Sequence, residues 1–288
     1  MAKTQEIRTK ITSISKTKKI TNAMQMVAAG KRRKVELRMQ ASMPYVDKIK
    51  AVIEHIMSSS SEYLNHPYFK ARSKIQRIGL VVVSTDRGLC GGLNINLFKK
   101  IILTIQEWQE QGVEVELFLI GTKAAVFFKN LKVHIRAQVK SLGDMPQLAD
   151  LIGTTKELRN AFDKTELDSL FIAYNEFINT MLQKPKVEQL LPFPNIDLTR
   201  KQRRWDYIYE PNSMLVLQTL LARYLETQLY QAVVDNIACE QAARMVAMQN
   251  ATKNAGEFID ALQLEYNKVR QAGITQEIAE IVGGAAAI

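Results

Sequence analysis

Residues 234–269 read VDNIACEQAARMVAMQNATKNAGEFIDALQLEYNKV, and the spacing of apolar residues in this stretch decides the fold. The apolar positions step alternately by four and three residues, which is the spacing of a coiled-coil seam with two polar interruptions. No proline follows Pro211, so this end can form one unbroken helix of about 70 residues. The seam positions are Val234, Ala238, Gln241, Met245, Met248, Thr252, Ala255, Ile259, Leu262, Tyr266 and Val269.

The N-terminal end repeats this spacing in two blocks, with a weak seam between them from Lys18 to Arg32. At about 1.5 Å per residue, helices of about 55 and about 70 residues reach roughly 80 and 105 Å, which is longer than a compact domain. Each helix carries only a narrow apolar stripe, so each needs a partner. The two blocks are Ile7, Ile11 and Ile14, then Val35, Met39, Ser42, Val46, Ile49, Ile53 and Ile56.

Charge makes the two ends suitable partners for each other. Residues 1–60 hold thirteen Lys or Arg against four Asp or Glu, whereas residues 211–288 hold five against eight. We therefore predict an antiparallel coiled coil formed by the two ends of the chain. The alternative is two sets of shorter helices folded into a bundle, because Gly30, Gly256 and Gly273 weaken a helix and Pro44 can kink one.

The middle of the chain alternates apolar, β-branched runs with helical patterns, which is typical of an α/β layer with a largely parallel sheet. We predict a central Rossmann-like domain over residues 61–210, between coiled-coil helices over residues 1–60 and 211–288. The predicted strands are 78–84, 114–120, 133–139 (a candidate edge strand), 169–174 and 187–191, and the predicted helices are 94–111, 123–130 and 146–162.

A glycine-rich turn, STDRGLCGGLN over residues 84–94, follows the first predicted strand and precedes a helix. Doubly wound folds bind phosphates at this position. However, the spacing is not G-x-G-x-x-G, and no Gly-Lys-Ser/Thr ending is present to hold a triphosphate. We expect a tight turn with an exposed contact loop, and keep a small α/β enzyme that uses this turn as an alternative.

Other patterns that support catalysis are weak in this sequence. The three histidines stand without companions at ligand spacing, and the two cysteines, Cys90 and Cys239, have neither Cys-x-x-Cys spacing nor an evident base. We expect both to be buried thiols. Glu277 and Glu280 share a helical face without an evident pocket. We therefore predict no catalytic residue, no metal and no cofactor.

Clusters of basic residues are the strongest electrostatic feature of the N-terminal end. They suit an acidic protein surface or phosphates, so a nucleic-acid-binding coiled coil is a further alternative. No aromatic residue precedes Pro44, which removes a stacking platform for single strands. Residues 200–211 have the composition of a docking surface, and the apolar tail 281–288 should be covered by a partner.

Three segments carry a resemblance to a known family: Ile20–Lys31 (ITNAMQMVAAGK), Asp86–Asn94 (DRGLCGGLN) and Ile274–Ala285 (ITQEIAEIVGGA). In this order, at both ends and in the middle, they resemble the gamma subunits of rotary F-type ATP synthases of bacterial type. The resemblance covers essentially the whole chain. It implies a non-catalytic central shaft, whose terminal helices enter an α3β3 hexamer while the α/β domain meets the epsilon subunit and the membrane ring.

The resemblance also implies the contact residues, and a peripheral location at the cytoplasmic face of a bacterial membrane. Two positions depart from the family pattern: Asn22 stands where lysine is common, and Gly30 where serine is common. The implied contacts with the hexamer are Met24, Lys31, Arg32, Arg244, Gln271, Thr275 and Glu277, and those of the foot near the ring and epsilon are Tyr207, Tyr209 and Glu210.

Overall fold

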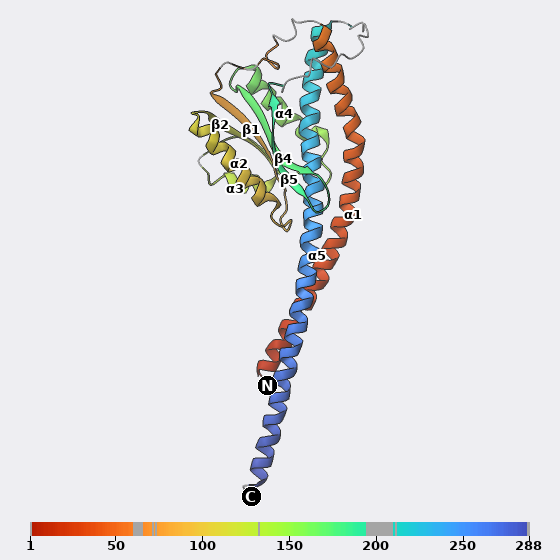
Figure 1. The fold of residues 1–288 in the computed structure, drawn as a ribbon, viewed down its shortest axis with the longest axis vertical. Helices are drawn as coiled ribbons and strands as arrows, with labels where there is room; N and C mark the ends of the chain where they lie inside the picture. Colours follow the sequence, from red (N-terminus) through yellow and green to blue (C-terminus); the bar gives the residue numbers. More distant parts are fainter. Residues whose placement is uncertain are drawn as a thin grey trace. The chain divides into compact units, whose positions relative to one another are not determined.

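The computed structural model describes residues 2–59, 66–70, 72, 74–131, 133–193, 210 and 212–286 (Figure 1). Each end of the chain forms one long helix, α1 over Ala2–Ser59 and α5 over Ser213–Ala286. The contacts divide the chain into two units, a terminal unit of residues 1–30 and 244–288 and a sheet unit of residues 31–243. The alternative of shorter helices in a bundle is therefore wrong.

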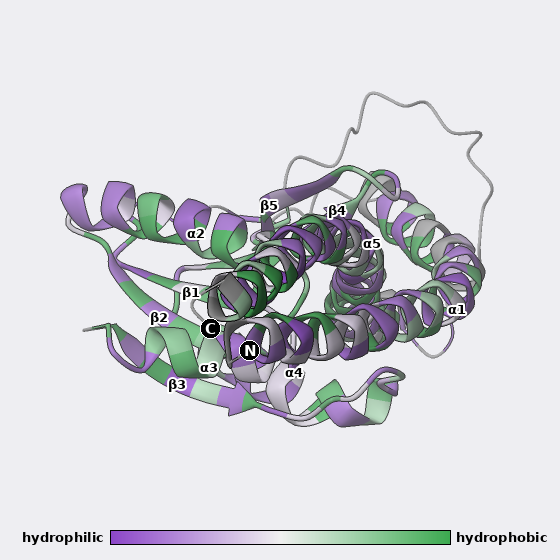
Figure 2. Ribbon diagram, turned by 90° about the horizontal axis from the view of Figure 1, so that it is seen from below, coloured by the Kyte–Doolittle hydropathy of each residue, from purple (hydrophilic) through white to green (hydrophobic). Residues whose placement is uncertain are grey.

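The breaks that glycine and proline could introduce are absent from α1 and α5 as described. Both helices continue through Gly30, Pro44, Gly256 and Gly273. A helical glycine costs only about 1 kcal/mol relative to alanine, so the many other residues of a long packed helix outweigh it. Figure 2 shows hydrophilic and hydrophobic residues mixed along both helices, so neither is apolar all round. No helix of the described residues is long and apolar enough to span a bilayer.

In the terminal unit, α1 and α5 pair in the predicted antiparallel sense. The Oγ1 atoms of Thr21 and Thr252 lie 2.8 Å apart, and a side chain at Gly256 would meet the Nζ atom of Lys18 at 3.1 Å. Residue numbers thus rise along α1 as they fall along α5. The predicted seam positions of this unit that are buried are Ile7, Met248 and Ala255, and Thr21 and Ala28 of the weak stretch are buried as well.

In the sheet unit, five strands follow the order β3-β2-β1-β4-β5. This is the strand order of a Rossmann-type sheet, except that the last strand runs in the opposite direction. Strands β1 to β4 pair in parallel, with β3 at the predicted edge, whereas β5 is antiparallel to β4. The short connection 178–182 allows a hairpin but no crossover helix. The strands are β1 (Arg77–Val83), β2 (Glu114–Ile120), β3 (His134–Val139), β4 (Ser169–Phe177) and β5 (Gln183–Leu191).

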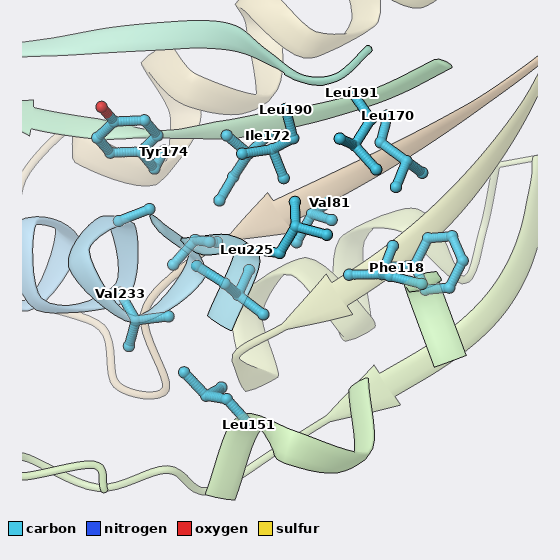
Figure 3. Packing of buried hydrophobic residues seen from close by; sticks show 14 of the residues in the cluster. Val81, Phe118, Leu151, Leu170, Ile172, Tyr174, Leu190, Leu191, Leu225 and Val233 are labelled. Atoms are coloured by element: carbon cyan, nitrogen blue, oxygen red, sulfur yellow. The ribbon is translucent and has the colours of Figure 1, made fainter. Parts of the chain in front are cut away.

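Alternate residues of β1 and β2 point to opposite faces of the sheet, so two apolar clusters form. On one face, Leu80 and Leu117 pack with α2 (Leu93–Glu110) and α3 (Thr122–Phe128). On the other, Val81 and Phe118 pack with α4 (Leu148–Asp163) and α5. Figure 3 shows Leu225 and Val233 of α5 and Leu151 of α4 within this second cluster. The predicted α/β domain with two long terminal helices is confirmed.

Candidate partner-contact surfaces

The turn between β1 and α2 is organised by the carboxylate of Asp86. Its Oδ1 atom accepts hydrogen bonds from the Thr122 backbone N–H and hydroxyl, both at 2.9 Å, and from the Ser141 N–H at 3.1 Å. Its Oδ2 atom accepts a hydrogen bond from the Gly143 N–H at 3.3 Å. Asp86 thereby joins the turn, the start of α3 and the loop after β3.

The ionised form of Asp86 is the one that this arrangement favours. Partial burial acts to raise the pKa of the carboxyl, but the hydrogen bonds from Thr122, Ser141 and Gly143 outweigh it and lower the pKa below its usual value. The carboxylate thus engages backbone N–H groups at the start of α3 and in the loop after β3, whereas a doubly wound fold would hold a phosphate at the start of α2. The missing G-x-G-x-x-G spacing therefore remains the feature that disfavours a nucleotide-using enzyme at the turn.

An apolar groove of about 660 Å³ lies next to the turn, between α2 and α3. Three apolar side chains that line it are largely exposed, namely Leu89, Ile95 and Val126. Lys99 and Lys123 also line the groove. The turn is therefore exposed beside an open apolar groove, as the sequence predicts, and its role as a contact loop stays a prediction.

The terminal unit presents the predicted contact residues of the hexamer unevenly. Met24 is half-buried, whereas Gln271, Thr275 and Glu277 of α5 are all exposed. Arg244 is buried, at 9% exposure. Exposed apolar side chains lie around the three polar residues of α5: Ile274, Ile278, Ile281 and Val282. This end of α5 thus combines polar and apolar side chains that are all open to a partner.

Two predicted contact residues are instead engaged within the sheet unit. The Lys31 Nζ atom lies 2.6 Å from Asp144 Oδ2, in the loop that Asp86 holds. Arg32 donates a hydrogen bond to the Thr180 hydroxyl, and its Nη1 atom lies 3.3 Å from Oε1 of Glu36. Both side chains remain partly exposed, so their assignment as hexamer contacts stays a prediction.

The predicted foot residues fall mostly outside the described part of the chain. Tyr207 and Tyr209 lie outside the described residues, and Glu210 is exposed. Among the residues that the structure describes, no group of three or more His, Cys, Asp or Glu side chains could hold a metal ion. Cys90 and Cys239 are both buried thiols, as predicted.

Polar side chains are also buried between β4 and α5, where sequence reasoning missed them. The Nδ2 atom of Asn175 in β4 donates a hydrogen bond of 2.9 Å to Oδ1 of Asn236 in α5, and the two residues are 0% and 1% exposed. The Cys239 thiol donates to the Asn175 carbonyl oxygen at 3.2 Å. An asparagine inside an apolar strand and another inside an apolar helix were the available signal.

Asp235 lies beside this layer, and its ionisation should oppose folding. Burial raises the pKa of its carboxyl to about 6, with a further contribution from Glu176, against the opposing effects of Gln231 and Lys186. A raised pKa in the folded state means that stability is fully present below the unfolded-state value and falls as the pH rises through 6. Asp235→Asn should therefore stabilise the protein by about 2 kcal/mol at pH 7.5 and have little effect at pH 4.

Urea unfolding of the full chain at the two pH values measures this difference. The matched control is Asp260→Asn, at an exposed position of the same helix, which should show no pH-dependent gain. Equal effects of Asp235→Asn at pH 4 and pH 7.5 would contradict the prediction.

Known proteins are similar in sequence to this chain over its whole length. Residues 3–288 match the family model described as ATP synthase. The chain is 56% identical over 290 residues to proteins named ATP synthase gamma chain from Legionella pneumophila strains Corby and Paris, with 100% of both chains covered.

Solved structures share the fold at lower identity. A chain of the mitochondrial ATP synthase of Euglena gracilis matches with a TM-score of 0.69 and 19% identity, over 99% of this chain and 94% of that one. A chain of the central stalk and c-ring structure from Tetrahymena thermophila matches with a TM-score of 0.60 and 22% identity, over 81% and 99%. Because it matches the family model over residues 3–288 and is 56% identical over its full length to the Legionella relatives, the chain belongs to the family of ATP synthase gamma chains.

Proposed function

We propose that this chain is the central shaft of a rotary ATP synthase and transmits torque without catalysing a bond change itself. The observation that carries the proposal is the 56% identity to ATP synthase gamma chains, which extends over the full length of both proteins. The exposed polar and apolar end of α5 supports it, because such a surface needs a partner that covers it.

The mechanism follows from asymmetry. A helix pair presents different side chains on each of its sides, so a shaft turning in a three-fold ring offers each catalytic subunit a different surface in succession. A partner shifts a conformational equilibrium only by its differential affinity for the two states. Each orientation of the shaft would therefore favour one catalytic conformation, and rotation driven by proton flow becomes release of ATP, while hydrolysis drives the reverse.

The proposed partners are the α and β subunits, through the terminal unit, and the epsilon subunit and c-ring, through the foot. The proposed location is peripheral, at the cytoplasmic face of a bacterial membrane. The division into residues 1–60, 61–210 and 211–288 remains the proposed domain organisation. The nucleic-acid-binding alternative rests on the basic N-terminal end alone and gains no support from the relatives.

Assembly and rotation test the proposal directly. The chain should co-purify in one copy with three α and three β subunits. A bead attached at a cysteine introduced at Lys99, which is exposed on α2, should turn in one direction during ATP hydrolysis and pause three times per revolution. Hydrolysis by the assembled complex with a stationary bead would contradict the proposal.

Charge reversal at Glu277 tests the predicted contact at the exposed end of α5. Glu277→Lys should lower ATP-driven proton pumping by about fivefold. The substitution removes a carboxylate that can pair with a basic side chain of the partner, and the new lysine repels that basic side chain. Asp260→Lys, at an exposed position of α5 outside the predicted contact set, is the matched control. Equal pumping by the two variants would argue against this contact.

A further inference from the structure

One stripe of the buried face of α5 in the sheet unit carries aliphatic side chains every four residues, so the packing of this stripe alone specifies the position along the helix axis poorly. Large aliphatic side chains recur at this interval, and all are at most 7% exposed. They are Leu217, Leu221, Leu225, Leu229, Val233 and Ile237. Figure 3 shows two of them, Leu225 and Val233, among the apolar side chains of the sheet and α4.

A four-residue step along an α-helix is a translation of about 6 Å combined with a rotation of about 40°. Under this screw motion each aliphatic side chain of the repeat takes the place of the next one. Apolar contacts are non-directional, so they distinguish poorly between the two positions. A helix under torque and axial load, as the proposed function requires, needs another element that distinguishes them.

The pair formed by Asn175 and Asn236 supplies this distinction. Their amide hydrogen bond is buried, and it joins β4 to α5 at a single position of the helix. A four-residue slip would place either Ala232 or Glu240 opposite Asn175, so the Asn175 amide would meet a methyl group or a longer, charged side chain. A buried amide that loses its hydrogen-bond partner raises the free energy of the folded state. Replacing one leucine by the next leucine of the repeat has no such cost.

The neighbouring contacts change in the same motion. Cys239 donates its thiol hydrogen to the Asn175 carbonyl oxygen, and after a slip this place falls to Asp235 or Ala243. Among the described residues, Asn175 Oδ1 is buried without a hydrogen-bond partner, so the amide is kept although it is not fully satisfied. Because an unsatisfied buried oxygen costs stability, the presence of Asn175 at this position is better explained by specificity than by stability.

We propose that Asn175 and Asn236 are positioning residues that fix the register of α5 against the sheet, so that torque applied to the sheet unit reaches the shaft without slippage. This inference rests on the proposed rotor function for its consequence, but the register itself is measurable without any turnover. The two can therefore fail separately.

The first test replaces both amides with apolar side chains. Spin labels at the exposed positions Gln106 in α2 and Thr219 in α5 report the distance between the two helices in the assembled complex. Asn175→Leu with Asn236→Leu should leave the denaturation midpoint of the protein unchanged, because neither partner remains as an unpaired buried amide. The double variant should nevertheless show a second population in which α5 is displaced by about 6 Å along its axis. Proton pumping per ATP hydrolysed should fall at least about twofold, since a slipping helix loses part of each step.

The second test moves the asparagine by one step instead of removing it, and remains informative if the leucine pair fails to fold. Ala232→Asn combined with Asn236→Ala should give one population, displaced by about 6 Å from that of the wild type. Thr227→Val is the control, because the buried Thr227 hydroxyl donates to the Arg223 carbonyl oxygen of its own helix and, among the described residues, makes no hydrogen bond to the sheet. A single, wild-type distance in both asparagine variants, with unchanged pumping, would overturn the proposal.

Discussion

Replacing Gly121 with alanine should destabilise the protein by about 4 kcal/mol, which is the largest effect that we expect from a single methyl group in this chain. Gly121 precedes α3 with φ at 98°, a conformation that side chains rarely adopt. Its added Cβ atom would lie 2.3 Å from the Ser84 carbonyl oxygen and 2.7 Å from the Ser84 hydroxyl. Backbone strain and a backbone clash therefore add, and urea unfolding of the full chain measures their sum.

Gly112 provides the matched control for Gly121. It also has a positive φ, of 75°, but nothing lies within 4 Å of the position that its Cβ atom would take. Gly112→Ala should thus cost only the conformational strain, about 1 to 2 kcal/mol. Equal losses for the two variants would show that the clash with Ser84 is relieved by a small backbone movement.

Asp86→Ala should have the second largest effect, a loss of about 3 kcal/mol at pH 7, because it leaves three backbone N–H groups and a hydroxyl without their charged acceptor. The pKa of this carboxyl is lowered in the folded state, so its contribution is present above the unfolded-state value and is lost as the pH falls through the folded value. The difference between wild type and variant should therefore shrink at pH below about 4.

Urea midpoints of the full chain between pH 7 and pH 3.5 check both statements. Thr122→Val removes only the hydroxyl donor and keeps the carboxylate and the backbone contacts, so it should cost about 1 kcal/mol. A difference between wild type and Asp86→Ala that stays constant over the whole pH range would contradict the role of the ionised carboxylate.

The parts of the fold that depend on local periodicity could be predicted from the sequence. The alternation of four-residue and three-residue steps from Val234 to Val269 favoured one long helix over several shorter ones, and the apolar run from Ile78 favoured a buried strand. Strand β5 was predicted only over residues 187–191, whereas it begins at Gln183. Its first half includes Pro185 and is only partly buried, so no apolar pattern marks it.

The parts that depend on contacts between distant residues could not be predicted in this way. Nothing near Asp86 in the sequence indicates that its partners stand at Thr122, Ser141 and Gly143. The pairing of Lys31 with Asp144 joins residues 113 positions apart. Such partners depend on how the strands are ordered in the sheet, and the spacing of apolar residues along the chain leaves that order open.

The burial of both cysteines has a practical chemical meaning. Cys90 is 3% exposed and Cys239 is 0% exposed, and burial raises the pKa of the Cys239 thiol. Thiol reagents react with exposed thiolates. Both cysteines are buried, and the raised pKa of Cys239 also keeps its thiol protonated at neutral pH. Maleimide dyes should therefore leave the native protein unmodified, and a single cysteine introduced on the surface can be labelled selectively without removing the natural ones.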